Sequence, residues 1–138
     1  MNNLSAVIYM TAQGIPFLQA GEEMLRTKID ASGGFVENSY NSPDSVNSIK
    51  WDTLEDEAYQ NVYNYYKGLI AFRKAHAALR LTNAADVNAN ITSVDGLDDN
   101  VLAFRINGGV NGETSDGIFV IFNPNSCLLY TSDAADDM

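Results

Sequence analysis

Five carboxylates lie between residues 22 and 44, and paired carboxylates are the groups that most glycoside hydrolases use. One of the two donates a proton to the leaving oxygen, and the other attacks the sugar or activates a water molecule. The candidates are Glu22, Glu23, Asp30, Glu37 and Asp44. Glu22 and Glu23 directly follow an apolar run, a place where barrel enzymes carry active-site groups. Neighbouring side chains usually point apart, however, so an ion pair between Glu23 and Arg26 that orders the loop is the favoured interpretation.

Short polar side chains crowd residues 38–47, which read Asn-Ser-Tyr-Asn-Ser-Pro-Asp-Ser-Val-Asn. Such a mixture suits a sugar, because amides and carboxylates bind paired hydroxyl groups and an aromatic face covers the C–H side of the ring. An ordinary surface loop rich in Asn, Asp and Ser has the same composition. Composition alone favours that simpler interpretation.

The other residues whose side chains could take part in catalysis or binding have structural interpretations. His76, the single histidine, has no partner for a catalytic or metal site, and at a helix end it is predicted to compensate the helix dipole. Trp51 precedes a long helix and is predicted to pack the loop down, with a sugar-stacking platform as the alternative. The sequence has no phosphate-binding loop, zinc-ligand spacing or nucleophile elbow. These residues therefore imply no cofactor.

Charge and hydropathy exclude two classes of partner. The formal net charge is −10, whereas binding to nucleic acid needs clustered Lys and Arg. No apolar run approaches the roughly 18 residues of a membrane span, and the apolar residues 4–10 follow no basic segment, so they are not a signal peptide. With 46% hydrophobic residues the chain can bury a core. We expect a globular protein with neither nucleic acid nor a membrane as partner.

Two apolar segments and a long polar connection open the chain. Residues 3–13 end before Gly14, which predicts a short helix closed by a glycine. Residues 15–20 form an apolar run without polar alternation, which predicts a strand buried on both faces, as in a parallel sheet. Residues 22–51 are polar, and a connection of about thirty residues is usually functional. A helix followed by a buried strand is half of a βα repeat.

A long helix is predicted over residues 54–78. Its apolar stripe recurs at three- and four-residue steps and comprises Tyr59, Val62, Tyr63, Tyr66, Leu69, Ile70 and Phe72. The tyrosines of this stripe are expected to pack in the core. Asp52 or Thr53 is the expected N-cap, and acids in the first turn with Arg73, Lys74 and His76 in the last turn match the helix dipole.

After residue 81 the apolar pattern changes to a period of two. Residues 87–94, 101–106 and 118–122 are short runs of β-branched or aromatic residues separated by turn sequences. This pattern predicts an antiparallel sheet. A second domain is therefore expected to begin near residue 82.

The last residues, 127–138, resemble a translated sequencing adapter. The match runs through Cys-Leu-Leu-Tyr-Thr-Ser-Asp-Ala-Ala-Asp, from Cys127 to Asp136. A segment of that origin does not take part in a fold. Cys127 is also the single cysteine, so the chain can form no internal disulfide and no thiolate metal site.

The run from Gln13 to Glu23, Gln-Gly-Ile-Pro-Phe-Leu-Gln-Ala-Gly-Glu-Glu, resembles the eighth-strand motif of the α-amylase superfamily, glycoside hydrolase family 13. Its continuation through residues 24–28, 38–47 and 49–52 looks like type I pullulanases. Residues 68–76 are similar to the last barrel helix of that family. The resemblance covers residues 2–125 and implies an α/β fold. Residues 1–81 would be the last helix–strand–helix of a (β/α)8 barrel, and residues 82–126 the start of an antiparallel β-sandwich domain.

The resemblance implies part of an enzyme that hydrolyses α-1,6 branch linkages in pullulan, glycogen or starch dextrins. The catalytic Asp, Glu and second Asp of the family follow the fourth, fifth and seventh strands, upstream of Met1, so no residue here is expected to be catalytic. Asp44 matches a carboxylate that binds sugar hydroxyls, and Asn47, Asn38 and Tyr40 are expected in the same wall. The superfamily often has an arginine four residues after this Asp, and Ser48 stands there in this sequence, which argues against an Asp–Arg clamp.

The expected partner is therefore an α-glucan, and calcium is the one metal ion that the parent enzyme could hold. Either a cytoplasmic or a secreted bacterial enzyme fits. An isoamylase or another family 13 hydrolase is the alternative within the class. A non-catalytic glucan-binding module is the alternative outside it, and the sequence upstream separates the two, because only the enzyme needs the three carboxylates.

Overall fold

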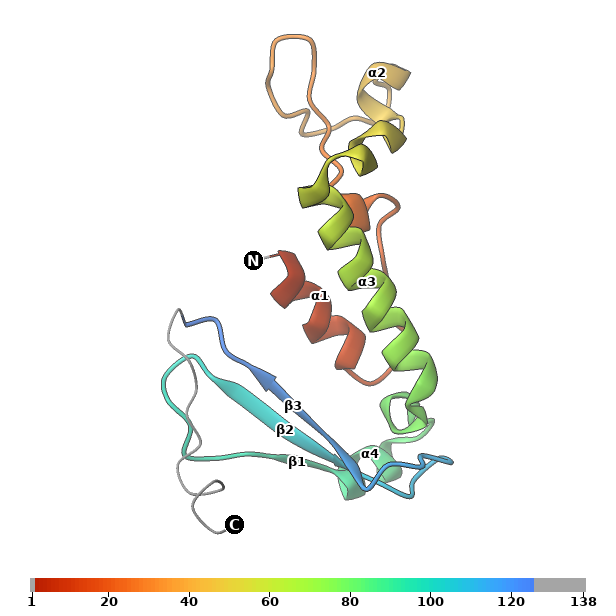
Figure 1. Ribbon diagram of the computed structural model, residues 1–138, viewed down its shortest axis with the longest axis vertical. Helices are drawn as coiled ribbons and strands as arrows, with labels where there is room; N and C mark the ends of the chain where they lie inside the picture. Colours follow the sequence, from red (N-terminus) through yellow and green to blue (C-terminus); the bar gives the residue numbers. More distant parts are fainter. Residues whose placement is uncertain (1, 126–138) are drawn as a thin grey trace.

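The structure is a computed structural model that describes residues 2–125. Helices α1 (Asn2–Thr11) and α3 (Glu57–Ala75) lie side by side, with a sheet at one end of the pair and the long connection at the other (Figure 1). The short elements are α2 (Asp44–Asn47), α4 (Ala84–Asn90) and the 3-10 helices η1 (Glu22–Met24), η2 (Trp51–Glu55) and η3 (Ala77–Arg80). The strands are β1 (Ile91–Ser93), β2 (Leu102–Asn107) and β3 (Gly117–Phe122). The predicted adapter-like tail, 127–138, lies outside the described residues.

The C-terminal end of α1 is held by a buried arginine of α3. Arg73 is 7% exposed and donates hydrogen bonds to the carbonyl oxygens of Met10 at 2.7 Å, Ala12 at 2.8 Å and Gly14 at 2.6 Å. The last carbonyls of a helix have no partner within it, so the guanidinium supplies what the helix lacks. Burial, and then the positive charge of Arg80, lower the pKa of Arg73, but a guanidinium stays charged at neutral pH.

Gln13 ties the same region to η3. Its amide nitrogen donates to the carbonyl of Ala78 at 2.9 Å, and its amide oxygen accepts from the backbone N–H of Leu81 at 2.9 Å. Both polar ends of one side chain are therefore used. The predicted helix over residues 3–13 is confirmed as α1, although it ends two residues earlier, at Thr11.

The predicted long helix is confirmed as α3, but its N-cap is not one of the predicted residues. Asp56 caps the helix by accepting from the N–H of Ala58 at 2.8 Å. Asp52 and Thr53 lie in η2, and the Thr53 hydroxyl donates to the carbonyl of Lys50 at 2.7 Å. The predicted helix over residues 54–78 is thus divided into η2, α3 and η3, because the chain bends at Asp56 and again at His76, where the backbone is extended.

The prediction that the tyrosine stripe of α3 packs in the core is wrong for most of its length. Of these residues only Tyr66 is buried, at 2% exposure, while Tyr63, Ile70 and Phe72 are exposed by more than a third. Helix α3 extends beyond α1 at the end near the long connection (Figure 1). Ile70 and Phe72 lie in the part of α3 beside α1 and are exposed all the same, so α1 covers only one side of α3.

The predicted strand over residues 15–20 is also wrong, because the structure has no strand there. Ile15 is 97% exposed and Phe17 is 89% exposed, the opposite of a strand buried on both faces. A strand exists only through ladder hydrogen bonds to a neighbour, and no segment among residues 2–125 pairs with this one. The apolar sequence thus remains without the partners that its pattern requires.

The C-terminal region forms the predicted antiparallel sheet, in the order β1-β2-β3. The strands predicted at 101–106 and 118–122 are confirmed within one residue at each end. The strand predicted at 87–94 is wrong over residues 87–90, which belong to α4. Asn83 starts this helix by accepting from the N–H of Asp86 at 2.8 Å, and such a cap favours a helix over a strand. Ile91–Ser93 pairs with β2, and the N–H of Val94 donates to the carbonyl of Ala103 at 3.0 Å.

The core lies between one face of this sheet and the helices. Ile106 pairs with Ile118 across the sheet, and these two residues pack with Val120, Phe122, Ala78 and Leu79, with Leu4 and Val7 of α1 against them. On the opposite face Phe119 and Ile121 are 55% and 39% exposed. One face of the sheet is therefore covered and the other carries exposed apolar side chains. Among the described residues no helix is long and apolar enough to cross a membrane.

A buried glutamate fastens the end of α3 to the hairpin that precedes β3. Glu113 is 6% exposed. Its carboxylate accepts from the N–H of Ala78 at 3.2 Å and lies 3.2 Å from Nδ1 of His76. The backbone N–H and the hydroxyl of Ser115 also donate to it, at 3.0 and 2.9 Å. His76 thus occupies the predicted helix end and also makes a contact that the sequence did not indicate.

Glu113 should make the stability of the chain sensitive to acid. The pKa of the Glu113 carboxyl is lowered from 4.5 to about 2, chiefly by the hydrogen bond from the N–H of Ser115. Burial acts in the opposite direction, and the bonds from the Ser115 hydroxyl, Ala78 and His76 lower the pKa further. Because the folded pKa lies below the unfolded one, the contribution is complete above about pH 4.5 and is lost as the pH falls towards 2. We expect the difference in thermal midpoint between wild type and Glu113→Gln to shrink over that interval.

The matched control is Glu37→Gln, since Glu37 is exposed and no hydrogen bond to its carboxylate is found among residues 2–125. Its midpoint should follow wild type at every pH. Parallel pH profiles for wild type and Glu113→Gln would contradict the assignment.

Candidate functional site

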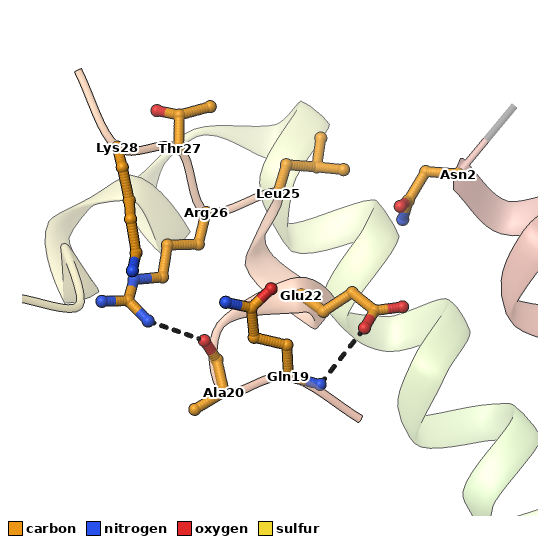
Figure 2. A pocket seen from close by; sticks show the side chains of 8 residues that line it. All are labelled: Asn2, Gln19, Ala20, Glu22, Leu25, Arg26, Thr27 and Lys28. Carbon is orange, nitrogen blue, oxygen red and sulfur yellow. Dashed lines mark hydrogen bonds between the residues drawn. The ribbon is translucent and has the colours of Figure 1, made fainter. Parts of the chain in front are cut away.

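A cavity of about 430 Å³, with mostly polar residue types in its lining, lies where the segment 15–20 turns into η1 (Figure 2). Asn2 reaches it from the start of α1, and the rest of the lining comes from the segment 19–28. The lining residues are Asn2, Gln19, Ala20, Glu22, Leu25, Arg26, Thr27 and Lys28. They include one carboxylate, two cations and several neutral polar groups, a mixture suited to hydroxyl-bearing ligands.

Glu22 is held in place by two tyrosines from different helices. The hydroxyls of Tyr9 and Tyr66 donate to one carboxylate oxygen at 2.7 and 3.0 Å, and the N–H of Gln19 donates to the other at 3.3 Å. Burial alone would raise the pKa of Glu22, but the bonds from the two tyrosines outweigh it and lower the pKa. Burial raises the pKa of Tyr9 and Tyr66 themselves. Glu22 is therefore an ionised anchor that joins η1 to α1 and α3.

The predicted ion pair between Glu23 and Arg26 is wrong. Glu23 accepts instead from the backbone N–H of Gly21 at 3.1 Å. Arg26 donates to the carbonyl of Ala20 at 3.2 Å and to the carbonyl of Asn47. Within the part of the chain that the structure describes, the one ion pair joins His76 and Glu113. Both side chains therefore bond to backbone groups and not to each other.

The segment 38–47 is held by its own amide groups and by a lysine. Asn47 donates both protons of its amide nitrogen, to the carbonyls of Ser39 at 2.8 Å and Ser42 at 2.9 Å. Lys28 donates to the hydroxyl of Ser39 at 2.6 Å. The segment is therefore an ordered loop, and the side chain of Asn47 shapes it from within.

Asp44, Tyr40 and Asn38 are exposed on this loop, and the side-chain oxygen of Asn38 bonds to the loop's own backbone. Asp44 is exposed at the first position of α2, and within residues 2–125 its carboxylate has no hydrogen-bond partner. Tyr40 is 92% exposed, and its backbone N–H donates to the side chain of Asn38 at 3.3 Å. The structure thus leaves a carboxylate and an aromatic ring available on one loop, and we refer to residues 38–47 as the loop wall.

The remaining sequence candidates have other positions. Asp30 accepts from the hydroxyl of Ser32 and from the N–H groups of Ser32 and Gly34. These bonds lower the pKa of Asp30, and the bond from the Ser32 hydroxyl contributes most. It therefore stabilises a turn. Trp51 is 64% exposed, so the prediction that it packs the loop down is wrong. Among the described residues no three His, Cys, Asp or Glu side chains gather closely enough to hold a metal ion.

The lining of the cavity suits a hydroxyl-bearing ligand, but it lacks the two carboxylates that glycosidic hydrolysis needs. Its lining contains one carboxylate, and that one accepts three hydrogen bonds. Hydrolysis of a glycosidic bond needs an acid and a second carboxylate across the scissile bond. Arg26 was predicted only as an ion-pair partner of Glu23 and Lys28 was not predicted as a site residue, since a cation that contacts carbonyls or a hydroxyl leaves no pattern in the sequence.

Known proteins with related sequences are α-glucan debranching enzymes, although no protein-family model matches the chain. The pullulanase of Bacillus subtilis (strain 168) is 40% identical over 103 residues, which cover 75% of this chain and 13% of that protein. The isoamylase of a Flavobacterium species is 33% identical over 135 residues, which cover 84% of this chain and 16% of that protein. The chain thus spans less than a fifth of each relative.

Solved structures agree with this similarity. A mutant pullulanase of Paenibacillus barengoltzii complexed with maltotetraose has a TM-score of 0.79 and 38% identity, with 90% of this chain and 18% of that chain covered. The pullulanase of Bacillus acidopullulyticus has a TM-score of 0.81 and 37% identity, with 90% and 14% covered. The paired helices and the three-stranded antiparallel sheet therefore match a portion of these larger folds.

Proposed function

Because the chain is homologous to type I pullulanases and isoamylases of glycoside hydrolase family 13, we propose that it is part of a longer enzyme that hydrolyses α-1,6 branch linkages. The proposed substrates are pullulan, glycogen and starch dextrins. The chain corresponds to 13% of the Bacillus subtilis relative, so most of the proposed enzyme lies outside it. We call that full-length protein the parent enzyme.

Within the parent enzyme, residues 1–81 would be the last helix–strand–helix of a (β/α)8 barrel and residues 82–126 the start of a β-sandwich domain. The exposed apolar residues support this division. Ile15 and Phe17 lie on a segment without a strand partner, as expected of a barrel strand whose neighbours are elsewhere in the protein. Phe119 and Ile121 lie on the uncovered face of the sheet, as expected of one layer of a sandwich.

The proposed contribution of this chain is to bind the glucan. The observation that carries the proposal is the loop wall, which presents a carboxylate without a partner in the described chain and an exposed aromatic ring. Asp44 would accept hydrogen bonds from sugar hydroxyls, and Tyr40 would cover an apolar sugar face with its ring. Asn38 would lie beside them, and Asn47 would act mainly by shaping the wall, since its amide nitrogen is already used. Ser48 offers no guanidinium for a clamp beside Asp44.

The bond cleavage itself would be performed by residues outside this chain. Retaining glycosidases use a nucleophilic carboxylate and a second carboxyl that serves first as acid and then as base. By the family resemblance, these groups and a further Asp would lie on earlier barrel strands. Glu22 would fix the floor of the cavity next to them, because its three hydrogen bonds hold η1 against both helices.

The test is to recover the coding sequence upstream of Met1 and to assay the purified parent enzyme on pullulan and on glycogen. The proposal expects three carboxylates at the ends of preceding strands and release of reducing ends from α-1,6 linkages. Glucan binding without hydrolysis would instead favour a non-catalytic module and would contradict the proposal.

A further inference from the structure

Arg26 joins the segment that ends at Ala20 to the segment that ends at Asn47, which lies 21 residues after Arg26 in the sequence. One terminal nitrogen of its guanidinium donates to the carbonyl of Ala20, at the end of the segment 15–20. The other donates to the carbonyl of Asn47, at the end of α2. Figure 2 shows the first of these bonds, with the arginine side chain running back towards Ala20. A single side chain therefore connects the edge of the cavity to the loop wall.

The backbone around η1 is shaped to bring Arg26 to this place. The N–H of Arg26 donates to the carbonyl of Gly21 at 2.9 Å, and Leu25 before it has a left-handed conformation with φ 52°. Gly21 has φ +90°, and a Cβ atom there would lie 2.7 Å from Cδ and 2.9 Å from Cβ of Arg26. Only glycine allows the arginine stem to lie against the backbone at this point.

Lys28 makes a second connection to the same wall. Its ammonium group donates to the hydroxyl of Ser39 at 2.6 Å, and Ser39 is 9% exposed. The carbonyl of Ser39 also accepts a hydrogen bond from the amide nitrogen of Asn47. The bonds from Arg26 and Lys28 thus converge on Ser39 and Asn47, which are themselves bonded to each other.

We propose that Arg26, assisted by Lys28, is a positioning residue that sets the loop wall at the correct distance from the cavity for the glucan to contact both. This inference rests on the proposed function. Asp44 and Asn47 are the first and last residues of α2, a single helical turn that is closed by the bond from the N–H of Ser48 to the carbonyl of Asp44. Holding the carbonyl of Asn47 therefore also holds Asp44.

The inference has a kinetic signature, because the wall binds the substrate in the ground state and in the transition state alike. Loss of such uniform binding raises KM and leaves kcat nearly unchanged. A residue that only stabilises the fold would instead lower the thermal midpoint and the active fraction, and the remaining folded molecules would keep their KM. Comparing the rise in KM with the fall in the thermal midpoint therefore distinguishes a positioning role from a purely structural one.

The experiment compares Arg26→Met, Arg26→Lys and a matched control, Arg105→Met, in the parent enzyme. Arg105 is exposed on β2, and no hydrogen bond to its side chain is found among residues 2–125. We expect Arg26→Met to raise KM for pullulan about tenfold, with kcat within about twofold of wild type. A tenfold change in KM is at the lower end of what loss of a charge-assisted hydrogen bond produces. Arg26→Lys keeps a cation that can reach one carbonyl and should raise KM by only about threefold.

Each outcome decides one of the two proposals. An unchanged KM in Arg26→Met, as in Arg105→Met, would overturn the positioning role even if the thermal midpoint fell. If Arg26→Met does not fold, an unchanged KM in Arg26→Lys would overturn it equally. A parent enzyme without hydrolytic activity would overturn the proposed reaction, and the dissociation constant for maltotetraose, measured by calorimetry, would then replace KM as the readout for Arg26.

Discussion

Replacing Asp44 by alanine in the parent enzyme should lower kcat/KM on pullulan roughly ten- to a hundredfold. Each charge-assisted hydrogen bond to a sugar hydroxyl should contribute about 1.5–3 kcal/mol, and 1.4 kcal/mol corresponds to a factor of ten. Asp44→Asn keeps the shape and loses the charge, so it should have a smaller effect. The thermal midpoint should change little, since Asp44 is exposed and its carboxylate bonds to no other group among residues 2–125.

The control for this prediction is Asp95→Ala, an exposed carboxylate in the turn after β1, which should retain wild-type kinetics. An alternative role for Asp44 is to stabilise the loop by bonding to its own backbone after Pro43. The structure gives its carboxylate no such bond, which favours the binding role. Lower stability with unchanged kinetics per folded molecule would remove Asp44 from the site.

Replacing Arg73 by methionine should lower the free energy of unfolding of the 138-residue chain by about 3 kcal/mol or more. The variant keeps much of the apolar stem and loses the guanidinium that bonds to three carbonyls at the end of α1. Hydrogen bonds to a charged group contribute about 1.5–3 kcal/mol each, and carbonyls left buried without a partner add a cost. Since domains are stable by about 5–15 kcal/mol, this is a large fraction. Urea unfolding monitored by circular dichroism measures it.

Lys74→Met is the matched control for Arg73. Lys74 is the next residue of α3 and is exposed, so its replacement should change the free energy of unfolding by less than about 0.5 kcal/mol. Equal losses in the two variants would contradict the view that Arg73 fastens α1 to α3.

Strong local patterns allowed part of the fold to be predicted from the sequence. The stripe of α3 and the alternating residues of β2 and β3 identify their own elements, because periodicity is a property of the segment itself. Burial is not such a property. Tyr63 and Phe17 have the pattern of core residues and are 37% and 89% exposed, since the segments that would cover them do not occur among residues 2–125.

The candidate site was predictable to a similar degree. The resemblance of residues 38–47 to a known family suggested Asp44 and Tyr40 as glucan-binding residues, which stays a prediction, and both are exposed on an ordered loop. The supporting contacts could not be predicted. Arg26 bonds to backbone carbonyls, and Glu113 joins a helix end to a hairpin 35 residues away, and such contacts depend on three-dimensional proximity alone. The predicted helix cap at Asp52 or Thr53 was wrong for a related reason, since several nearby residues can cap a helix and Asp56 does so.

The most direct test of the central proposal, that this chain supplies glucan-binding residues while the catalytic carboxylates lie upstream, is a parallel assay of the isolated chain and the parent enzyme. Both are incubated with pullulan and with an activated α-glucoside, and reducing ends and released leaving group are measured. We expect hydrolysis by the parent enzyme and none above the buffer control by the chain, whose cavity contains a single carboxylate that already accepts three hydrogen bonds. Turnover by the isolated chain that disappears in Asp44→Ala or Glu23→Ala would contradict the account.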